Sequence, residues 1–213
     1  MKPLLVVLSS PSGAGKTTIA EDLVGARSDV GRSVSATTRD PRAGEVDGRD
    51  YHFLTSAEFA RRVTAGDFIE SATYGGQRYG TLKAEVDRLR RAGRHALLVI
   101  EVAGAREIRR QFPGAVLVFL LPPSGEALVS RLASRETEAA EALRRRLAIA
   151  SDELGAAREY DYLVVNDDRA RAVAEIATIL DAESLRVTRH ENVGGLVGEI
   201  RRGIRAAAEN LKD

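Results

Sequence analysis

The 213-residue sequence predicts an α/β fold in which helices cover both faces of a parallel sheet. Four continuous apolar runs are the first observation, because parallel strands that are buried on both faces have this composition. They are LLVVL at 4–8, ALLVIEV at 96–102, AVLVFLL at 115–121 and DYLVVND at 161–167. Helical patterns that alternate with these runs are the second observation. We expect helices at residues 17–24, 82–92, 104–111, 124–134, 138–158 and 169–182.

The segment 33–81 interrupts this alternation and is the third observation. It places Pro, Gly and Asp residues between short polar strands, with one helical pattern among them. This composition predicts a small mixed α+β lobe inserted into a core made of residues 1–32 and 82–186. Within that core, the strongly charged residues 134–147 favour a helical lid. We expect residues 187–213 to form a C-terminal tail that packs as a terminal helix, with self-association as the alternative.

The charge balance and the absence of cysteine exclude several classes of protein. Lys and Arg number 32 against 31 Asp and Glu, so the net charge of +1 gives no overall attraction to nucleic acid or to an acidic membrane. The chain has no cysteine, which excludes disulfides and thiolate metal sites. No apolar stretch approaches a membrane span in length, and the run after Met1 is too short for a signal peptide. We therefore expect a cytoplasmic protein with neither nucleic acid nor membrane as a partner.

The stretch SSPSGAGKTT at 9–18 joins the first apolar run to the first helix. It fits the phosphate-loop pattern G-x-x-x-x-G-K-[ST], except that Ser10 stands where the pattern has glycine. In such a loop the backbone N–H groups face the phosphates, Lys16 reaches the β- and γ-phosphates, and the Thr17 hydroxyl binds Mg²⁺. The alternative is a glycine turn that only connects strand and helix. The predicted ATP contacts in this loop are Ser12, Gly13, Ala14, Gly15, Lys16, Thr17 and Thr18.

A second anion site is indicated by SVSATTRDPRAGEVDGRDYHF at 33–53. This turn-rich segment contains Ser35, Arg39, Arg42 and Tyr51. Two arginines and a tyrosine hydroxyl can hold a phosphate monoester through charge-assisted, forked hydrogen bonds.

These motifs resemble those of guanylate kinases, which are P-loop nucleoside monophosphate kinases. The family pattern S-x-T-T-R-x-P-R-x-G-E-x-x-G-x-x-Y is matched in full at 35–51. YGT at 79–81, LPPS at 121–124 and EYDYLVVNDD at 159–168 also match, so that the resemblance covers about residues 3–186. It implies a P-loop kinase core, a GMP-binding lobe at 33–81 and a lid, with Mg²⁺-dependent transfer of phosphate from ATP to GMP or dGMP. The resemblance is compatible with a monomer or a homodimer.

The resemblance also implies a role for individual residues. Those that hold the phosphate of GMP are Arg39, Arg42, Tyr51 and Tyr79, and those that read guanine are Ser35, Glu70 and Thr81. Glu101 is the retained member of an acidic pair beside the site, and we assign it to GMP binding. Asn166 lies at the strand end near the adenine of ATP. The catalytic set is Lys16, Arg39, Arg131, Arg135 and Arg146, of which the last three close over the transferred phosphoryl group. Each residue also has a structural alternative, such as a lobe-core tyrosine, a solvated arginine or an exposed strand-end glutamate.

The chain departs from the family pattern in three places. At the end of the strand at 96–102, Val99 replaces the first acid of the family's D-[IV]-[DE]-x-Q-G and Ala103 replaces its glutamine. The acceptor side has Thr73 and the sequence GQR at 76–78, and the lid has Glu136 and Ala139 in place of glycine and threonine. Two alternatives to a guanylate kinase therefore remain. One is a kinase of the same fold for a modified purine or another nucleoside monophosphate, and the other is a non-catalytic binding module.

Overall fold

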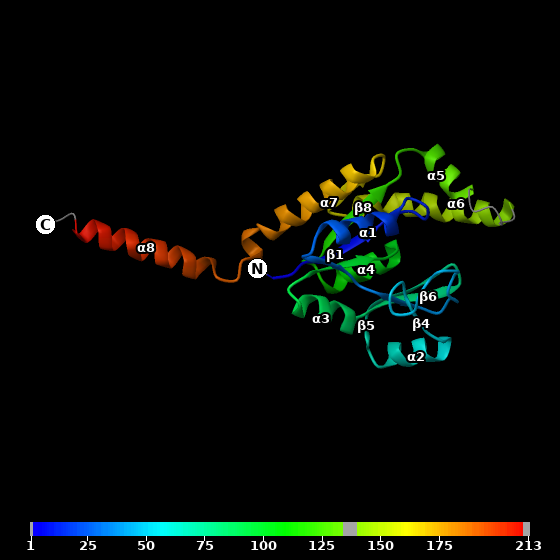
Figure 1. Ribbon diagram of the computed structural model, residues 1–213, viewed down its shortest axis with the longest axis horizontal. Helices are drawn as coiled ribbons and strands as arrows, with labels where there is room; N and C mark the ends of the chain where they lie inside the picture. The colour runs from blue at the N-terminus through cyan, green and yellow to red at the C-terminus, as the bar shows by residue number, and fades with distance from the viewer. Residues whose placement is uncertain (1, 134–139, 211–213) are drawn as a thin grey trace.

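The computed structural model describes residues 2–133 and 140–210. Its centre is a parallel five-stranded sheet with strand order β2-β7-β1-β8-β9 (Figure 1). The strands are β1 (Leu5–Ser9), β2 (Val30–Arg32), β7 (His95–Val99), β8 (Val116–Leu121) and β9 (Tyr162–Val165). The sheet confirms the predicted α/β fold.

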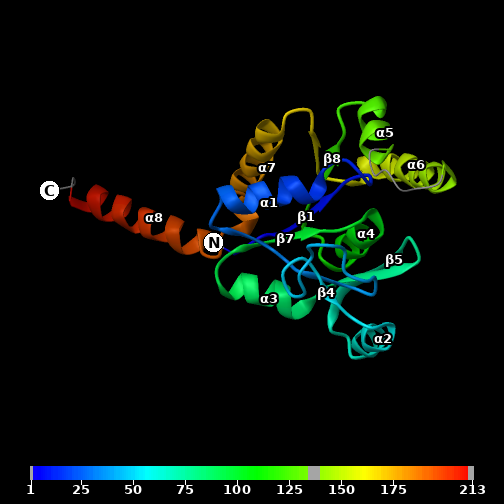
Figure 2. The ribbon, with the colours of Figure 1, turned by 45° about the vertical axis from the view of Figure 1, so that its right-hand side comes forward.

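Helices cover both faces of this sheet because successive side chains of a strand point to opposite faces. Figure 2 shows α1 (Lys16–Ala26) and α7 (Arg169–Ser184) on one side, and α3 (Lys83–Arg91) and α4 (Val102–Gln111) on the other. In β1 and the residue before it, Leu4, Val6 and Leu8 pack toward α1 and α7, whereas Leu5 and Val7 pack toward α3 and α4. The continuous apolar run Leu4–Leu8 therefore contributes side chains to two cores.

A second, mixed sheet confirms the predicted inserted lobe. Its strand order is β4-β3-β6-β5, and α2 (Ser56–Thr64) packs against it. The strands are β3 (Ser35–Thr37), β4 (His52–Phe53), β5 (Phe68–Tyr74) and β6 (Gln77–Leu82). β6 is antiparallel to both β3 and β5, and β3 is parallel to β4.

Some element boundaries differ from those expected. β2 has no apolar run and was not predicted, because its three residues, VGR, contain glycine and arginine. The predicted strand at 96–102 ends at Val99, and Glu101 precedes the first residue of α4 as its N-cap. The predicted helix at 138–158 is α6 (Ala140–Gly155) followed by the 3₁₀ turn η1 (Ala156–Glu159).

The described part of the lid region packs as a helical pair. α5 (Gly125–Ala133) and α6 share a small apolar cluster made of Leu128, Leu132 and Ala150. Of the predicted lid at 134–147, the residues from 140 onward belong to α6. Arg135, Glu136 and Ala139 lie outside the described residues.

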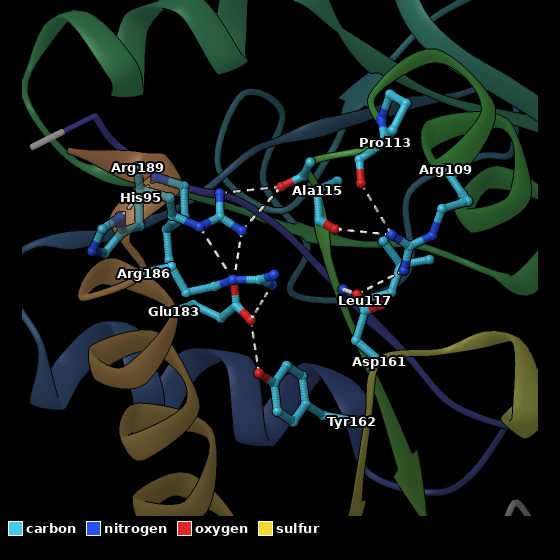
Figure 3. A network of polar contacts seen from close by, with 12 residues as sticks. His95, Arg109, Pro113, Ala115, Leu117, Asp161, Tyr162, Glu183, Arg186 and Arg189 are labelled. Carbon is cyan, nitrogen blue, oxygen red and sulfur yellow. Dashed lines mark hydrogen bonds and ion pairs between the residues drawn. The ribbon is translucent and has the colours of Figure 1, made fainter. Parts of the chain in front are cut away.

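A buried polar network anchors the end of α7 to the body (Figure 3). Glu183 is 4% exposed and accepts hydrogen bonds from the Tyr162 hydroxyl at 2.7 Å and from Arg189 Nη2 at 2.6 Å. Nearby, Arg109 Nη2 donates to Asp161 Oδ2 at 2.6 Å, and the same oxygen accepts from the Leu117 N–H at 2.8 Å. The network extends through Arg189, in the 3₁₀ turn η2 (Val187–Arg189), to the beginning of the tail.

Beyond this anchor, α8 (Val193–Asn210) extends away from the body in both views. Its large apolar side chains are exposed, including Leu196, Ile200 and Ile204 at 61%, 57% and 64%. The expectation that the tail packs as a terminal helix is therefore wrong for this helix. No described helix is both long and apolar enough to cross a membrane.

Candidate active site

The phosphate loop has the backbone geometry that its sequence predicts. Gly13 and Gly15 adopt left-handed conformations, with φ values of 87° and 95°. A Cβ at Gly15 would lie 2.7 Å from Nδ2 of Asn166, so a side chain at this position would also displace the Asn166 amide. α1 begins at Lys16, directly after Gly15, and its N-terminal N–H groups therefore face the loop.

The departure at Ser10 leaves this geometry intact. Among the residues that the structure describes, positive φ values occur only at glycines, so Ser10 has a conformation open to any residue. Its hydroxyl donates to the carbonyl of Pro11 at 3.0 Å, and the residue is 1% exposed. Serine is therefore compatible with a phosphate loop at this position.

Lys16 points from the start of α1 toward the end of β7. Its Nζ lies 2.9 Å from Glu101 Oε2 and 3.3 Å from the carbonyl oxygen of Ile100. The Lys16 side chain is only 12% exposed, so this ion pair is screened weakly by solvent. Glu101, which we assigned to GMP, therefore contacts the lysine of the phosphate loop in this structure.

Three of the predicted acceptor residues lie side by side on neighbouring strands. Thr81 on β6 is in register with Ser35 on β3 and with Glu70 on β5. The Thr81 hydroxyl donates to Glu70 Oε1 at 2.7 Å, which fixes the carboxyl. Glu70 is 5% exposed, and burial raises its pKa to about 7.

Close approach of α4 leaves room for this carboxyl only because residue 104 is glycine. A Cβ at Gly104 would lie 2.6 Å from Glu70 Oε2. The carboxyl of Glu70 is thus enclosed by the lobe on one side and by the core on the other.

The predicted phosphate-binding residues form a cluster around Arg39. Its guanidinium lies over the rings of Tyr51 and Phe53, at 5.1 and 5.6 Å from their centroids. Glu45 holds it by a forked ion pair, with Nη1–Oε2 and Nη2–Oε1 distances of 2.7 and 2.6 Å. The Arg39 guanidinium holds the pKa of Glu45 below its usual value.

Glu45 is a site residue that the sequence interpretation missed. Besides Arg39, its Oε2 accepts a hydrogen bond from the backbone N–H of Arg42 at 2.7 Å. One carboxylate therefore contacts both arginines that are predicted to bind phosphate. The sequence signal for Glu45 was its place as the glutamate of the family pattern matched at 35–51, but the sequence interpretation gave this glutamate no role.

One cavity of about 720 Å³ joins the phosphate loop, the lobe and the start of α4. It brings together most of the predicted site residues: Ser12, Gly13, Gly15, Lys16, Thr17, Thr18, Ser35, Arg39, Arg42, Tyr51, Glu70, Tyr79, Glu101 and Arg131. Val99 and Ala103, where the family pattern has an acid and a glutamine, line the same cavity. In Figure 1 the lobe and the α5–α6 pair lie at the end of the body opposite α8.

Four of the remaining predicted residues do not line the cavity: Ala14, Thr81, Arg146 and Asn166. Ala14 is fully buried, and its carbonyl accepts hydrogen bonds from Asn166 Nδ2 at 2.7 Å and from Arg131 Nη1 at 3.3 Å. Asn166 therefore supports the phosphate loop in this structure. Thr81 is linked to the cavity by the hydrogen bond that its hydroxyl donates to Glu70. Arg146 donates a hydrogen bond to the carbonyl of Leu132 at 3.4 Å. Arg135 lies outside the described residues.

A phosphate loop and a second, arginine-bearing anion site in one cavity define a class of protein. It is the class of P-loop α/β proteins with a separate lobe for a second ligand. Comparison with known proteins specifies the family.

The family model described as guanylate kinase matches residues 2–183. Among similar curated proteins, the guanylate kinase of Symbiobacterium thermophilum is 47% identical over 189 residues, which are 89% of this chain and 90% of that protein. The guanylate kinase of Nitrosospira multiformis is 43% identical, with 87% and 88% of the two chains covered. The crystal structure of guanylate kinase from Anaplasma phagocytophilum superposes with a TM-score of 0.77 at 31% identity, covering 93% of this chain and 95% of that one. The chain belongs to the guanylate kinase family.

Proposed function

We infer that this protein is an ATP:GMP phosphotransferase. It transfers the γ-phosphoryl group of ATP to the phosphate of GMP and forms ADP and GDP. The observation that carries this function is the shared cavity, in which Lys16 of the phosphate loop and the Arg39–Glu70 side of the lobe face the same space. Family membership favours this reaction over a same-fold kinase for another acceptor and over a non-catalytic module.

On the donor side, the loop amides and the N-terminus of α1 bind the triphosphate, and Lys16 neutralises its β- and γ-phosphates. Mg²⁺ would be held by the Thr17 hydroxyl, in the first turn of α1 and on the cavity wall, together with phosphate oxygens and water. The Thr17 hydroxyl fits such an ion, because Mg²⁺ prefers oxygen ligands and keeps several waters and phosphate oxygens beside one or two protein ligands. The ion supplies charge neutralisation on the phosphates when it is bound.

On the acceptor side, Arg39, Arg42, Tyr51 and Tyr79 hold the phosphate of GMP. Glu70 reads guanine, because its carboxylate can accept hydrogen bonds from N1–H and the 2-amino group. Adenine lacks donors at these positions, so an acceptor-only side chain discriminates between the two purines.

During transfer, the arginines of the α5–α6 side neutralise charge that develops on the equatorial phosphoryl oxygens. Arg131 lines the cavity, and Arg146 lies on α6. Enclosure of both nucleotides between lobe, core and lid keeps water from competing with GMP.

Substitution of Arg42 tests the acceptor assignment. Arg42→Ala removes a charged phosphate contact, so we expect the KM for GMP to rise about 10- to 100-fold while the KM for ATP changes by less than about 3-fold. Arg61→Ala is the matched control, because Arg61 is an exposed lobe arginine that binds Glu58 on its own helix. An unchanged KM for GMP in Arg42→Ala would contradict the assignment.

A further inference from the structure

A buried carboxyl that the sequence interpretation did not single out contacts the phosphate loop. Glu153 lies near the end of α6 and is 8% exposed. Its Oε2 accepts a hydrogen bond from the backbone N–H of Ser12 at 3.1 Å, across 141 positions of the chain. The bond ties the loop to the helix that also packs against α5.

Glu153 also faces the charged groups around Lys16. Its carboxyl lines the same cavity as Glu101, which itself forms the 2.9 Å ion pair with Lys16. From β5, the Tyr74 hydroxyl is the further titratable group that faces Glu153. One ammonium group and two carboxyls therefore occupy the same wall of the cavity.

The Glu153 carboxyl is harder to ionise than that of an ordinary glutamate. Burial, followed by the charge of Glu101, raises the pKa of Glu153 to about 7. When Glu153 is protonated, the Lys16–Glu101 ion pair is the charge pair that remains beside it.

We propose that Glu153 is a positioning residue for ATP, because it fixes the Ser12 segment of the phosphate loop to α6. This role rests on the proposed function only in naming ATP as the ligand. Ionisation of Glu153 places its charge beside the bound phosphates and weakens binding. Loss of its side chain releases the loop from α6.

The test is calorimetric titration of Mg-ATP without GMP, from pH 6 to 8.5, on four proteins: wild type, Glu153→Gln, Glu153→Ala and Asp152→Asn. Glutamine keeps an acceptor for the Ser12 N–H but does not ionise. We expect the Kd of the wild type to rise about 10-fold more over this range than that of Glu153→Gln. Titration of ATP itself occurs in both and cancels in the comparison.

The other two variants separate the effect of the charge on Glu153 from the effect of its hydrogen bond to Ser12. Asp152→Asn removes a charge from the neighbouring exposed position and keeps Glu153, so it retains the wild-type pH dependence. Glu153→Ala loses the bond to Ser12, so at pH 6 we expect it to bind ATP about 10-fold more weakly than Glu153→Gln and to have a lower kcat, with a KM for GMP within about 2-fold.

Equal pH dependence in wild type and Glu153→Gln, or equal affinity of the alanine and glutamine variants at pH 6, would overturn the proposal. Melting temperatures of all four proteins show whether a variant is folded, and Glu153→Gln alone suffices if the alanine variant is not. Because no acceptor is present, the result is independent of whether GMP is the substrate. Absence of ATP binding by the wild type would instead contradict the proposed function.

Discussion

The two ends of the cavity, where we propose that ATP and GMP bind, are built in different ways. The donor end consists mainly of backbone, with two left-handed glycines and the N-terminus of α1, to which Lys16 adds one side-chain cation. The acceptor end uses side chains that are held by other side chains, as Arg39 is by Glu45 and Glu70 is by Thr81. The donor site therefore depends on a loop conformation, whereas the acceptor site depends on a few ion pairs and hydrogen bonds that single substitutions can remove.

The largest effect is expected at the donor end. Lys16→Ala removes the one side-chain cation of the loop from the β- and γ-phosphates, so we expect kcat to fall about 10³-fold. GMP binding, measured by calorimetry without ATP, should change by less than about 3-fold. A comparable loss of GMP affinity would show that the two ends are not separable.

At the acceptor end, Glu70→Gln tests how guanine is read. The amide opposes one guanine donor with its own NH₂ group, so we expect kcat/KM for GMP relative to AMP to fall about 10²-fold. Ser71→Ala is the matched control, because Ser71 is the exposed neighbour on the same strand. Unchanged selectivity in Glu70→Gln would contradict the role of Glu70.

The raised pKa of Glu70 gives the wild type a pH dependence of stability that Glu70→Gln lacks. Because its folded pKa of about 7 exceeds the unfolded value, the protonated carboxyl stabilises the fold at low pH, and this contribution is lost as the pH rises through 7. We expect the free energy of unfolding of the ligand-free protein to fall by about 1–3 kcal/mol more between pH 5 and 8 than that of Glu70→Gln. GMP affinity should have the opposite trend and rise through pH 7, because guanine binds the ionised carboxylate. Identical unfolding curves against pH in the two proteins would contradict the burial argument.

We expect the smallest effect on the KM for GMP from substitution of Glu45, which contacts both Arg39 and Arg42. Glu45→Gln weakens the ion pair with Arg39 but leaves both arginines in place, so the KM for GMP should rise about 10-fold with little change in the KM for ATP. Glu58→Gln is the matched control, since Glu58 pairs with Arg61 and Arg62 on the exposed side of α2. Equal effects of the two substitutions would show that Glu45 has no special link to GMP.

The sequence predicted the parts of the molecule that are encoded locally. Apolar runs gave the strands β1, β7, β8 and β9 to within a few residues, and the glycine-lysine pattern placed the phosphate loop. The guanine-reading set was predicted from the family resemblance, and strand register then placed Ser35, Thr81 and Glu70 together. Their roles in binding stay predictions until the variants above are measured.

The sequence did not predict the features that depend on contacts between distant residues or on the absence of a packing partner. The bond from Ser12 to Glu153 joins residues 141 positions apart, and no local pattern specifies such a pair. The exposed face of α8 could not be predicted, because the same amphipathic spacing is typical of a helix that packs against a core. β2 is too short to form an apolar run, and it is defined only by its pairing with β7.

The most direct test of the central claim is ADP release by the wild-type protein with ATP and Mg²⁺ against GMP, dGMP, AMP, CMP, UMP and no acceptor. The account predicts rapid turnover with the guanine nucleotides alone and little ATP hydrolysis in their absence. A higher kcat/KM for a non-guanine monophosphate, or silence with every acceptor from a protein that binds ATP, would contradict it.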